Sequence, residues 1–152
     1  MKHLHCRHRI RVEAPVDRAF LYFTPDGERH WVDGWEPVWL HPDDGRTEVG
    51  MVFTTGTGPE YTVWTLADFD RAAHRSRYLR CTPASRLVVV EIGCRALDAG
   101  RTEVDVAYTL TALKAAAEPV VDTFAAGFAA MVDGWAERIA ARREHLLAVD
   151  LR

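Results

Sequence analysis

The chain has 152 residues, of which 48% are hydrophobic and 27% are charged, a composition typical of one globular domain with a sizeable core. Its formal net charge is -3, its sequence pI is near 6.1, and its arginines are scattered rather than gathered into a run. This balance argues against a nucleic-acid partner, which usually selects a basic surface.

The N-terminal stretch MKHLHCRHRI lacks the apolar core that a signal peptide needs. No apolar stretch approaches the roughly 18 residues expected of a membrane span. The cysteines at positions 6, 81 and 94 are odd in number and have no metal-type spacing, so they indicate reduced thiols and a cytoplasmic location. We find no repeat or linker and expect a single domain over residues 1–152.

Residues 3–13 alternate between apolar and charged side chains, which predicts a half-buried strand. Three histidines in this segment raise the question of a metal site. His3 and His5 share a face, but His8 points the other way and no carboxylate is near in sequence. A polar N-terminal strand is therefore favoured over a metal site.

Pro15 opens a short helix that is broken at residues 24–27, and a second short helix or turn follows through residues 28–31. The rest of the chain before residue 112 consists of apolar-rich runs separated by turn residues. We expect strands at residues 36–41, 48–55, 61–69, 74–81, 86–95 and 101–111. Strands followed by one long helix indicate an α+β layout.

Residues 118–147 are predicted to form one long helix near the C-terminus. Pro119 fits its first turn, and thirty residues would span about 45 Å. Apolar residues recur at steps of three and four, which places them on one stripe: Val121, Phe124, Phe128, Met131, Val132, Trp135, Ile139 and Leu146. Such a stripe needs a broad apolar partner, so we expect the strands to form a sheet curved around this helix.

Four segments carry a resemblance to a known family when taken in order: IRVEAPVDRAFLYF, RHWVDGWEPV, EVGMVF and AEPVVDTFAAGFAAMVDGWAERI. Together they resemble the START-like or Bet v 1-like superfamily, which contains polyketide cyclases and dehydrases and lipid-transfer domains. The resemblance implies a helix-grip fold: a seven-stranded curved antiparallel sheet around a long C-terminal helix, with two short helices between the first two strands. It also implies an apolar ligand cavity between sheet and helix, but it identifies no catalytic residue.

The side chains that face this cavity depend on strand register. Along residues 101–111 one face carries Val104, Val106, Tyr108 and Leu110, and we expect it to point inward. A regular hairpin at residues 96–100 would pair Val106 with Glu91. Carrying the same face across residues 82–85 places Tyr78 and Arg80 inward, with His74 at the end of the strand. A single β-bulge would invert this result.

We therefore expect a ligand to be bound by Tyr78, Arg80, Glu91 and Tyr108 of the sheet and by Phe124, Phe128 and Met131 of the helix. A carboxylate and a guanidinium on an inward face are costly unless they are paired, hydrated or met by a ligand. The alternatives are a satisfied internal hydrogen-bond network, a different register, and ordinary core packing of the aromatic residues.

Gly127 and Gly134 lie a heptad apart on one flank of the predicted helix. Each costs about 1 kcal/mol of helix stability relative to alanine. Glycine usually marks close approach of another backbone, and the alternative is room for a ligand beside Phe128 and Met131.

The first functional hypothesis is binding of an apolar or aromatic small molecule, such as a lipid, polyketide or isoprenoid. The second is an enzyme resembling polyketide cyclases or dehydratases, in which Arg80 or a tyrosine polarises a carbonyl and Glu91 or His74 moves a proton. No catalytic triad, metal-ligand set or cofactor motif is present in the sequence, so no cofactor is expected.

A third hypothesis is a protein-interaction module like the chaperone-activating branch of the same superfamily. It would use exposed aromatic residues, and the candidates are Trp31, Trp35 and Trp39. The sequence does not indicate an oligomeric state.

Overall fold

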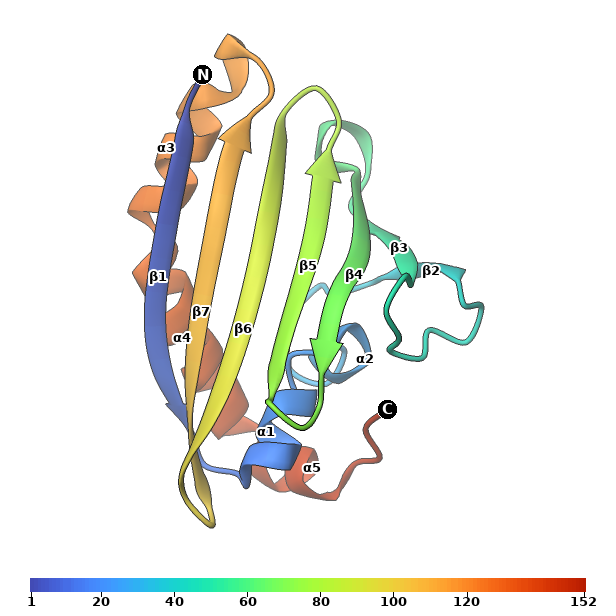
Figure 1. Ribbon diagram of the computed structural model, residues 1–152, viewed down its shortest axis with the longest axis vertical. Coiled ribbons are helices and arrows are strands. Elements are labelled where there is room, and N and C mark those ends of the chain that lie inside the picture. Colours follow the sequence, from blue (N-terminus) through green and yellow to red (C-terminus); the bar gives the residue numbers. More distant parts are fainter.

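The computed structural model describes residues 1–152, and its strands form one seven-stranded antiparallel sheet in the order β1-β7-β6-β5-β4-β3-β2. Figure 1 shows this sheet curved, with the helices on one of its faces. The strands are β1 (His3–Val12), β2 (Val38–His41), β3 (Val52–Thr55), β4 (Thr62–Asp70), β5 (Arg75–Thr82), β6 (Arg86–Asp98) and β7 (Arg101–Ala112). The expected strand order is confirmed, although β3 is shorter than the predicted strand at residues 48–55.

Two short helices lie between the first two strands, as expected: α1 (Val16–Leu21) and α2 (Pro25–Glu28). The predicted break at residues 24–27 is in fact the start of α2, because Thr24 caps it and Pro25 occupies its first turn. The remaining helices are η1 (Gly58–Glu60), η2 (Ala115–Ala117), α3 (Glu118–Ala126), α4 (Phe128–Ala141) and α5 (Arg143–Ala148).

The long C-terminal helical segment is present, but it is not the one straight helix that the periodicity predicts. It is interrupted at Gly127, where φ is −94° and ψ is 3°, and again at Arg142. The N–H of Gly127 is shared between the carbonyls of Thr123 and Phe124, at 3.2 Å from each. The result is a bend of 52° between residues 115–126 and residues 128–141. No single helix is long and apolar enough to cross a membrane. Only the two helices on either side of the bend, taken together, have the length and the apolar composition of a membrane span.

The register of β6 against β7 differs from the prediction by one residue. Val106 pairs with Ile92 and not with Glu91, because a bulge between Ala96 and Asp98 inserts one residue into β6 next to the hairpin. The even-numbered residues of β6 therefore face inward, and Glu91 lies on the outer face of the sheet. The prediction that Glu91 points into the interior is wrong for this reason.

The register of β5 against β6 also differs by one residue. Thr82 pairs with Arg86, so the connection has three unpaired residues, with Ala84 at a φ of 58°. This second shift cancels the first. Tyr78 pairs with Val90 and Arg80 with Val88, and both face inward as predicted.

The core lies between the inner face of the sheet and the helices. Of the predicted helix stripe, five residues are buried: Val121, Phe128, Val132, Ile139 and Leu146. Phe124, Met131 and Trp135 are only half-buried and pack against the edge of this core. These three side chains form the border between the core and the surface along α3 and α4.

Neither helix glycine is in close contact with another element, so the favoured explanation for them is wrong. A Cβ atom at Gly134 would meet no atom within 4 Å, and one at Gly127 would meet only carbonyl oxygens of its own helix, at 3.7 Å or more. Gly127 instead marks the bend, and Gly134 leaves open space beside α4.

The open space at Gly134 predicts that a larger residue there would stabilise the protein. Gly134→Ala should raise the free energy of unfolding by about 0.5–1 kcal/mol, because alanine is the better helix former and its methyl group meets no neighbour. Urea denaturation at equilibrium measures the change. As a control, Gly45→Ala should lower the free energy of unfolding by about 1 kcal/mol or more, since Gly45 has a φ of 69° and its Cβ would lie 2.2 Å from the Trp39 ring. A destabilising Gly134→Ala would contradict the open flank.

Candidate functional site

A small void lies between the inner face of the sheet, α2 and α4, with a volume of about 20 Å³. That is room for about one water molecule. The interior is thus nearly filled, and the ligand-sized hollow expected from the resemblance is not open. The void is bordered mainly by aromatic and aliphatic side chains: Phe23, Pro25, Glu28, Phe53, Trp64, Tyr78, Val90, Ile92, Tyr108 and Trp135.

Arg80 does not line the void, but its guanidinium group lies against two rings that do, those of Trp64 and Tyr108. Its guanidinium carbon is 5.1 Å from the ring centre of Trp64, 5.4 Å from that of Tyr108 and 5.5 Å from that of Phe124. Its Nε is buried without a hydrogen-bond partner, and the side chain makes no ion pair. Burial lowers the pKa of Arg80, but an arginine remains charged in a protein. Arg80 is half-buried, only its Nε is fully buried, and its guanidinium group lies against aromatic faces.

Two tyrosines share the inner face with Arg80. Tyr78 is the neighbour of Arg80 on β5, and its hydroxyl is buried with no partner. Burial raises the pKa of Tyr78 well above its usual value, and it raises that of Tyr108 to about 12 against the opposing effect of Arg80. Both hydroxyls therefore keep their protons near neutral pH and can donate a hydrogen bond to a bound molecule.

The sequence reasoning missed Glu28, the last residue of α2, which borders the void from the side opposite the sheet. Its side chain makes no hydrogen bond or ion pair. Burial raises the pKa of its carboxyl from about 4.5 to about 8, although Arg80 acts in the opposite direction. Glu28 is half-buried, and its carboxyl oxygens keep some accessible surface. At neutral pH Glu28 is mostly protonated and neutral.

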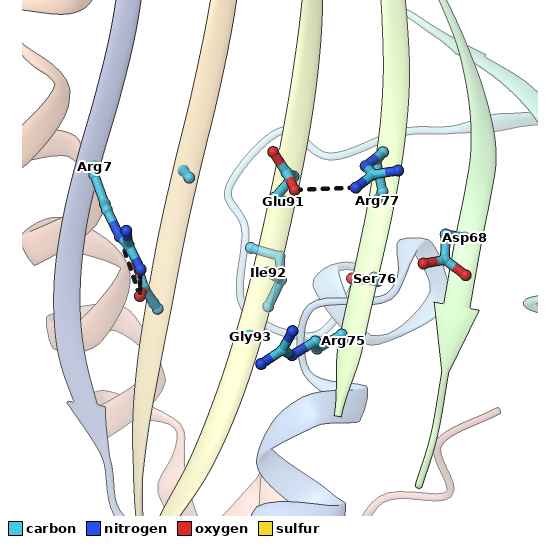
Figure 2. A pocket seen from close by; sticks show the side chains of 10 residues that line it. Arg7, Asp68, Arg75, Ser76, Arg77, Glu91, Ile92 and Gly93 are labelled. Carbon is cyan, nitrogen blue, oxygen red and sulfur yellow. Dashed lines mark hydrogen bonds and ion pairs between the residues drawn. The ribbon is translucent and has the colours of Figure 1, made fainter. Parts of the chain in front are cut away.

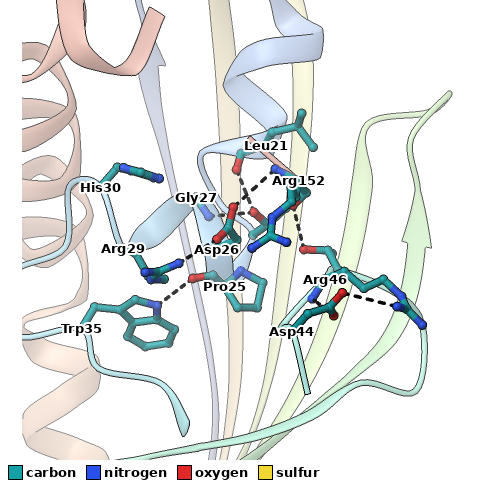
Figure 3. Close-up of polar contacts among 12 residues, drawn as sticks. Leu21, Pro25, Asp26, Gly27, Arg29, His30, Trp35, Asp44, Arg46 and Arg152 are labelled. Atoms are coloured by element: carbon teal, nitrogen blue, oxygen red, sulfur yellow. Dashed lines mark hydrogen bonds and ion pairs between the residues drawn. The ribbon is translucent and has the colours of Figure 1, made fainter. Parts of the chain in front are cut away.

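The placement of Glu28 follows from how α2 is anchored. A Cβ at Gly27 would lie 2.0 Å from the carbonyl oxygen of Leu21, so only glycine allows α2 to pack this closely after α1. Figure 3 shows the contacts on the other side of α2, where the buried Asp26 accepts hydrogen bonds from Arg29 at 3.1 Å and from the backbone N–H of Arg152 at 3.4 Å. The TPDG sequence signals the helix start, but nothing in it signals which way Glu28 points.

Glu91, which was predicted to bind the ligand, lies on the outer face of the sheet. Figure 2 shows it directed toward Arg77 of β5, and the two side chains form an ion pair of 3.4 Å. Both side chains are about half-exposed. They border a separate surface depression of about 390 Å³ that also includes Arg7, Arg75, Gly93 and Asp105. The sheet separates this depression from the interior.

The remaining predicted residues gather around Tyr108. Phe124 stacks on its ring at 5.7 Å between centroids, and Phe128 meets it edge-on at 5.0 Å. Met131 is half-buried against the same core. His74, considered as a proton carrier, does not border the void: its Nε2 lies 2.7 Å from Asp17 of α1.

The tryptophans do not form an exposed cluster. Trp31 is fully buried and donates to the carbonyl of Tyr22, and Trp35 donates to the carbonyl of Pro25. Trp39 is half-buried with its ring against Phe53. The observation that would favour an interaction module is therefore missing. No group of three or more histidine, cysteine, aspartate or glutamate side chains is arranged to hold a metal ion.

The unpaired hydroxyl of Tyr78 predicts an unusual response to mutation. Tyr78→Phe should leave the free energy of unfolding unchanged or raise it by up to about 1 kcal/mol, because no hydrogen bond is lost and a buried polar group is removed. As a matched control, Thr62→Val should lower it by about 1–3 kcal/mol, since the Thr62 hydroxyl is buried and bonds the Thr82 hydroxyl at 2.7 Å. Chemical denaturation of both variants provides the comparison. A clear loss of stability in Tyr78→Phe would show that its hydroxyl has a partner.

The Glu28 carboxyl predicts a pH-dependent stability. Between about pH 4.5 and about pH 8 the folded chain holds a proton that the unfolded chain has lost, so the free energy of unfolding should fall as the pH rises. Glu28→Gln removes this contribution and supplies the background from all other groups. The stability of the wild type relative to this variant should fall by about 1–2 kcal/mol across the range, after allowance for residual solvent. Denaturation curves at a series of pH values test this, and parallel profiles for the two proteins would contradict it.

A scan against protein-family models finds no match, and a search of curated proteins finds no relative. Solved structures do resemble this one. Norcoclaurine synthase from Thalictrum flavum superimposes with a TM-score of 0.66 at 13% identity, covering 91% of this chain and 87% of that one. Ara h 8.0201 gives 0.65 at 13% identity, covering 97% and 100%. The Zhui aromatase/cyclase from Streptomyces sp. R1128 gives 0.55 at 20% identity, covering 95% and 87%.

Identities this low establish a common fold and leave the activity open. The resemblance seen in the sequence and the likeness of the structures agree on the element order, the antiparallel sheet and the closing helices. The chain has the helix-grip fold of the START-like, or Bet v 1-like, superfamily.

Proposed function

We propose that this protein binds an apolar or aromatic small molecule, of lipid, polyketide or isoprenoid type, between the sheet and the C-terminal helices. The aromatic side chains bury the body of the ligand, at about 25 cal/mol for each Å² removed from water. Tyr78, Arg80, Tyr108 and Glu28 contact its polar end. Phe124, Phe128 and Met131 cover it from the helical side.

The observation that carries the proposal is the pair of unpartnered polar groups inside an aromatic enclosure. Both the Tyr78 hydroxyl and Arg80 Nε are buried with no hydrogen bond. Burying such a group without a partner costs about 1–3 kcal/mol, and more when it is charged. A satisfied internal network, the main alternative, would give these atoms partners within the chain. A bound molecule with acceptor oxygens would supply them.

The void of about 20 Å³ is far smaller than any such ligand, so binding requires side chains to move. Trp135 is the main candidate. Trp64, which also borders the void, is fixed by a hydrogen bond of 2.9 Å to Thr55, whereas the Trp135 indole makes no hydrogen bond and is half-buried. The Trp135 ring contacts three aromatic rings, with distances of 6.0–6.4 Å between ring centres: those of Phe23, Trp31 and Tyr108. Outward rotation of Trp135 would open the interior along α4.

Catalysis of the polyketide cyclase or dehydratase type is a second candidate, and Glu28 is the observation that favours it. A carboxyl whose pKa is about 8 can both hold and release a proton near neutral pH. Arg80 and Tyr78 are donors that could polarise a carbonyl in the same space. In this candidate Glu28 takes the proton-transfer role that the sequence had suggested for Glu91.

Two broader expectations belong to the same proposal. Residues 1–152 act as a single domain, since all seven strands share one sheet and one continuous core. The three cysteines are all free, which fits a reducing compartment such as the cytoplasm.

The proposal is tested by filling the void. Wild-type protein should bind the neutral probe N-phenyl-1-naphthylamine, with enhanced probe fluorescence and quenched tryptophan emission. Val90→Phe places a ring in the void and should weaken binding by about tenfold or more, because the probe and the new side chain compete for the same space. Native mass spectrometry of the purified wild-type protein should also reveal a co-purifying apolar molecule.

Val89→Phe is the matched control, because Val89 is the adjacent residue on the outer face of β6. It should bind the probe as the wild type does, and circular dichroism should show both variants folded. If the wild type fails to bind the probe up to its solubility limit, or if Val90→Phe binds equally well, the interior is not a binding site.

A further inference from the structure

We propose that the natural ligand of this interior is an anion: an aromatic or apolar molecule that carries one acidic group. The acidic group of the ligand pairs with Arg80, and the carboxylate of Glu28 competes with that group for Arg80. This inference rests on the proposed binding function and identifies the ligand class. It is carried by the arrangement of charges around the void.

Arg80 is half-buried and has no carboxylate within ion-pair distance, which sets it apart from the buried Arg86. Arg86, at the start of β6, is buried and lies 2.7 Å from Glu60, which satisfies its charge. On the outer face of β5, Arg77 pairs with Glu91 at 3.4 Å. The chain thus provides a carboxylate for each of these neighbours and leaves Arg80 with aromatic contacts alone. A half-buried charge without a counter-ion keeps part of its desolvation cost, and a ligand carboxylate would compensate it.

Glu28 is the one carboxyl that borders the same void. The groups facing it are Tyr78 and Arg80 from β5 and Tyr108 from β7, while α4 contributes the uncharged Trp135. Near neutral pH the tyrosines and Glu28 are uncharged, so the enclosed groups carry a net positive charge from Arg80. An anionic ligand is then favoured over a neutral molecule of the same shape.

Raising the pH should reverse this preference. Once Glu28 loses its proton, its carboxylate balances the positive charge of Arg80 and repels an anionic ligand. By linkage, if the anion binds only when Glu28 is protonated, its affinity falls by up to about tenfold for each pH unit above the pKa of Glu28. A neutral ligand should show no such decline.

The experiment compares 2-naphthoate with 2-naphthamide, which has the same shape but no charge. Naphthoate stays ionised from about pH 6 upward, because carboxylic acids have pKa values of about 4. Isothermal titration at about pH 6.5 should show naphthoate binding the wild type at least about tenfold more tightly than the amide. This preference should be lost in Arg80→Gln, and the decline in naphthoate affinity above about pH 8 should be lost in Glu28→Gln.

Arg77→Gln is the control for Arg80→Gln, since it removes a positive charge from the outer face of the same strand. It should keep the preference for naphthoate. Thermal unfolding establishes that each variant is folded, and the wild-type pH profile alone remains informative if Glu28→Gln does not fold.

The outcomes separate the two proposals. Equal affinity of the wild type for both probes, or an Arg80→Gln variant that still prefers naphthoate, overturns the anion inference and leaves the binding function standing. Naphthoate affinity that is flat through about pH 8–9 in the wild type overturns the role given to Glu28. Failure of both probes to bind, together with failure of N-phenyl-1-naphthylamine, overturns the binding function itself.

Discussion

The guanidinium of Arg80, held among three aromatic rings without a carboxylate, is the interaction on which the interior of this protein depends. A desolvated cation over an aromatic face gains about 2 kcal/mol. Removing an ion from water costs several kcal/mol even after the protein relaxes. The contacts with the rings of Trp64, Tyr108 and Phe124 are together of the same order as this cost. No carboxylate of the chain compensates this charge, which is why Arg80 is central to the proposed binding site.

The position of Glu28 explains why no carboxylate of the chain pairs with Arg80. Its helix, α2, has a single turn and is fixed by close contact of Gly27 with the end of α1 and by the contacts of Asp26. The backbone therefore holds the carboxyl near the void but out of ion-pair distance from Arg80. Glu28 lines the void and Arg80 lies behind the rings of Trp64 and Tyr108, and the two side chains form no ion pair. A molecule that enters between them would meet donors on the sheet side and a titratable carboxyl on the helix side.

The sequence predicts the architecture well because periodicity is a local property. Alternation along β7 and the spacing of Val121, Phe128 and Val132 determine which face of each element is buried. Register is not local in this sense. One bulged residue at Leu97 reverses the facing of all of β6, and it moves Glu91 from the interior to the surface. The inward placement of Tyr78 and Arg80 was predicted only because a second one-residue shift at the next hairpin cancels the first.

The parts of the site that escaped prediction are those whose direction is set by tertiary contact. A one-turn helix such as α2 has too few residues to show a periodic face, so Glu28 gives no signal in the sequence. The bend at Gly127 is similar. Glycine lowers helix stability, but whether the helix bends depends on what the sheet requires on either side.

That bend also determines how firmly the interior is closed. Phe124 lies before it, whereas Met131 and Trp135 lie after it, and all three remain half-buried at the border of the core. Open space beside Gly134 leaves the flank of α4 without a packed neighbour. The small size of the void therefore reflects the positions of side chains such as Trp135 that no hydrogen bond fixes, whereas Trp64 is held by its hydrogen bond to Thr55. Movement of the α4 side chains would enlarge this interior while the strands that carry Tyr78 and Arg80 keep their positions, so a nearly full interior is compatible with the proposed binding.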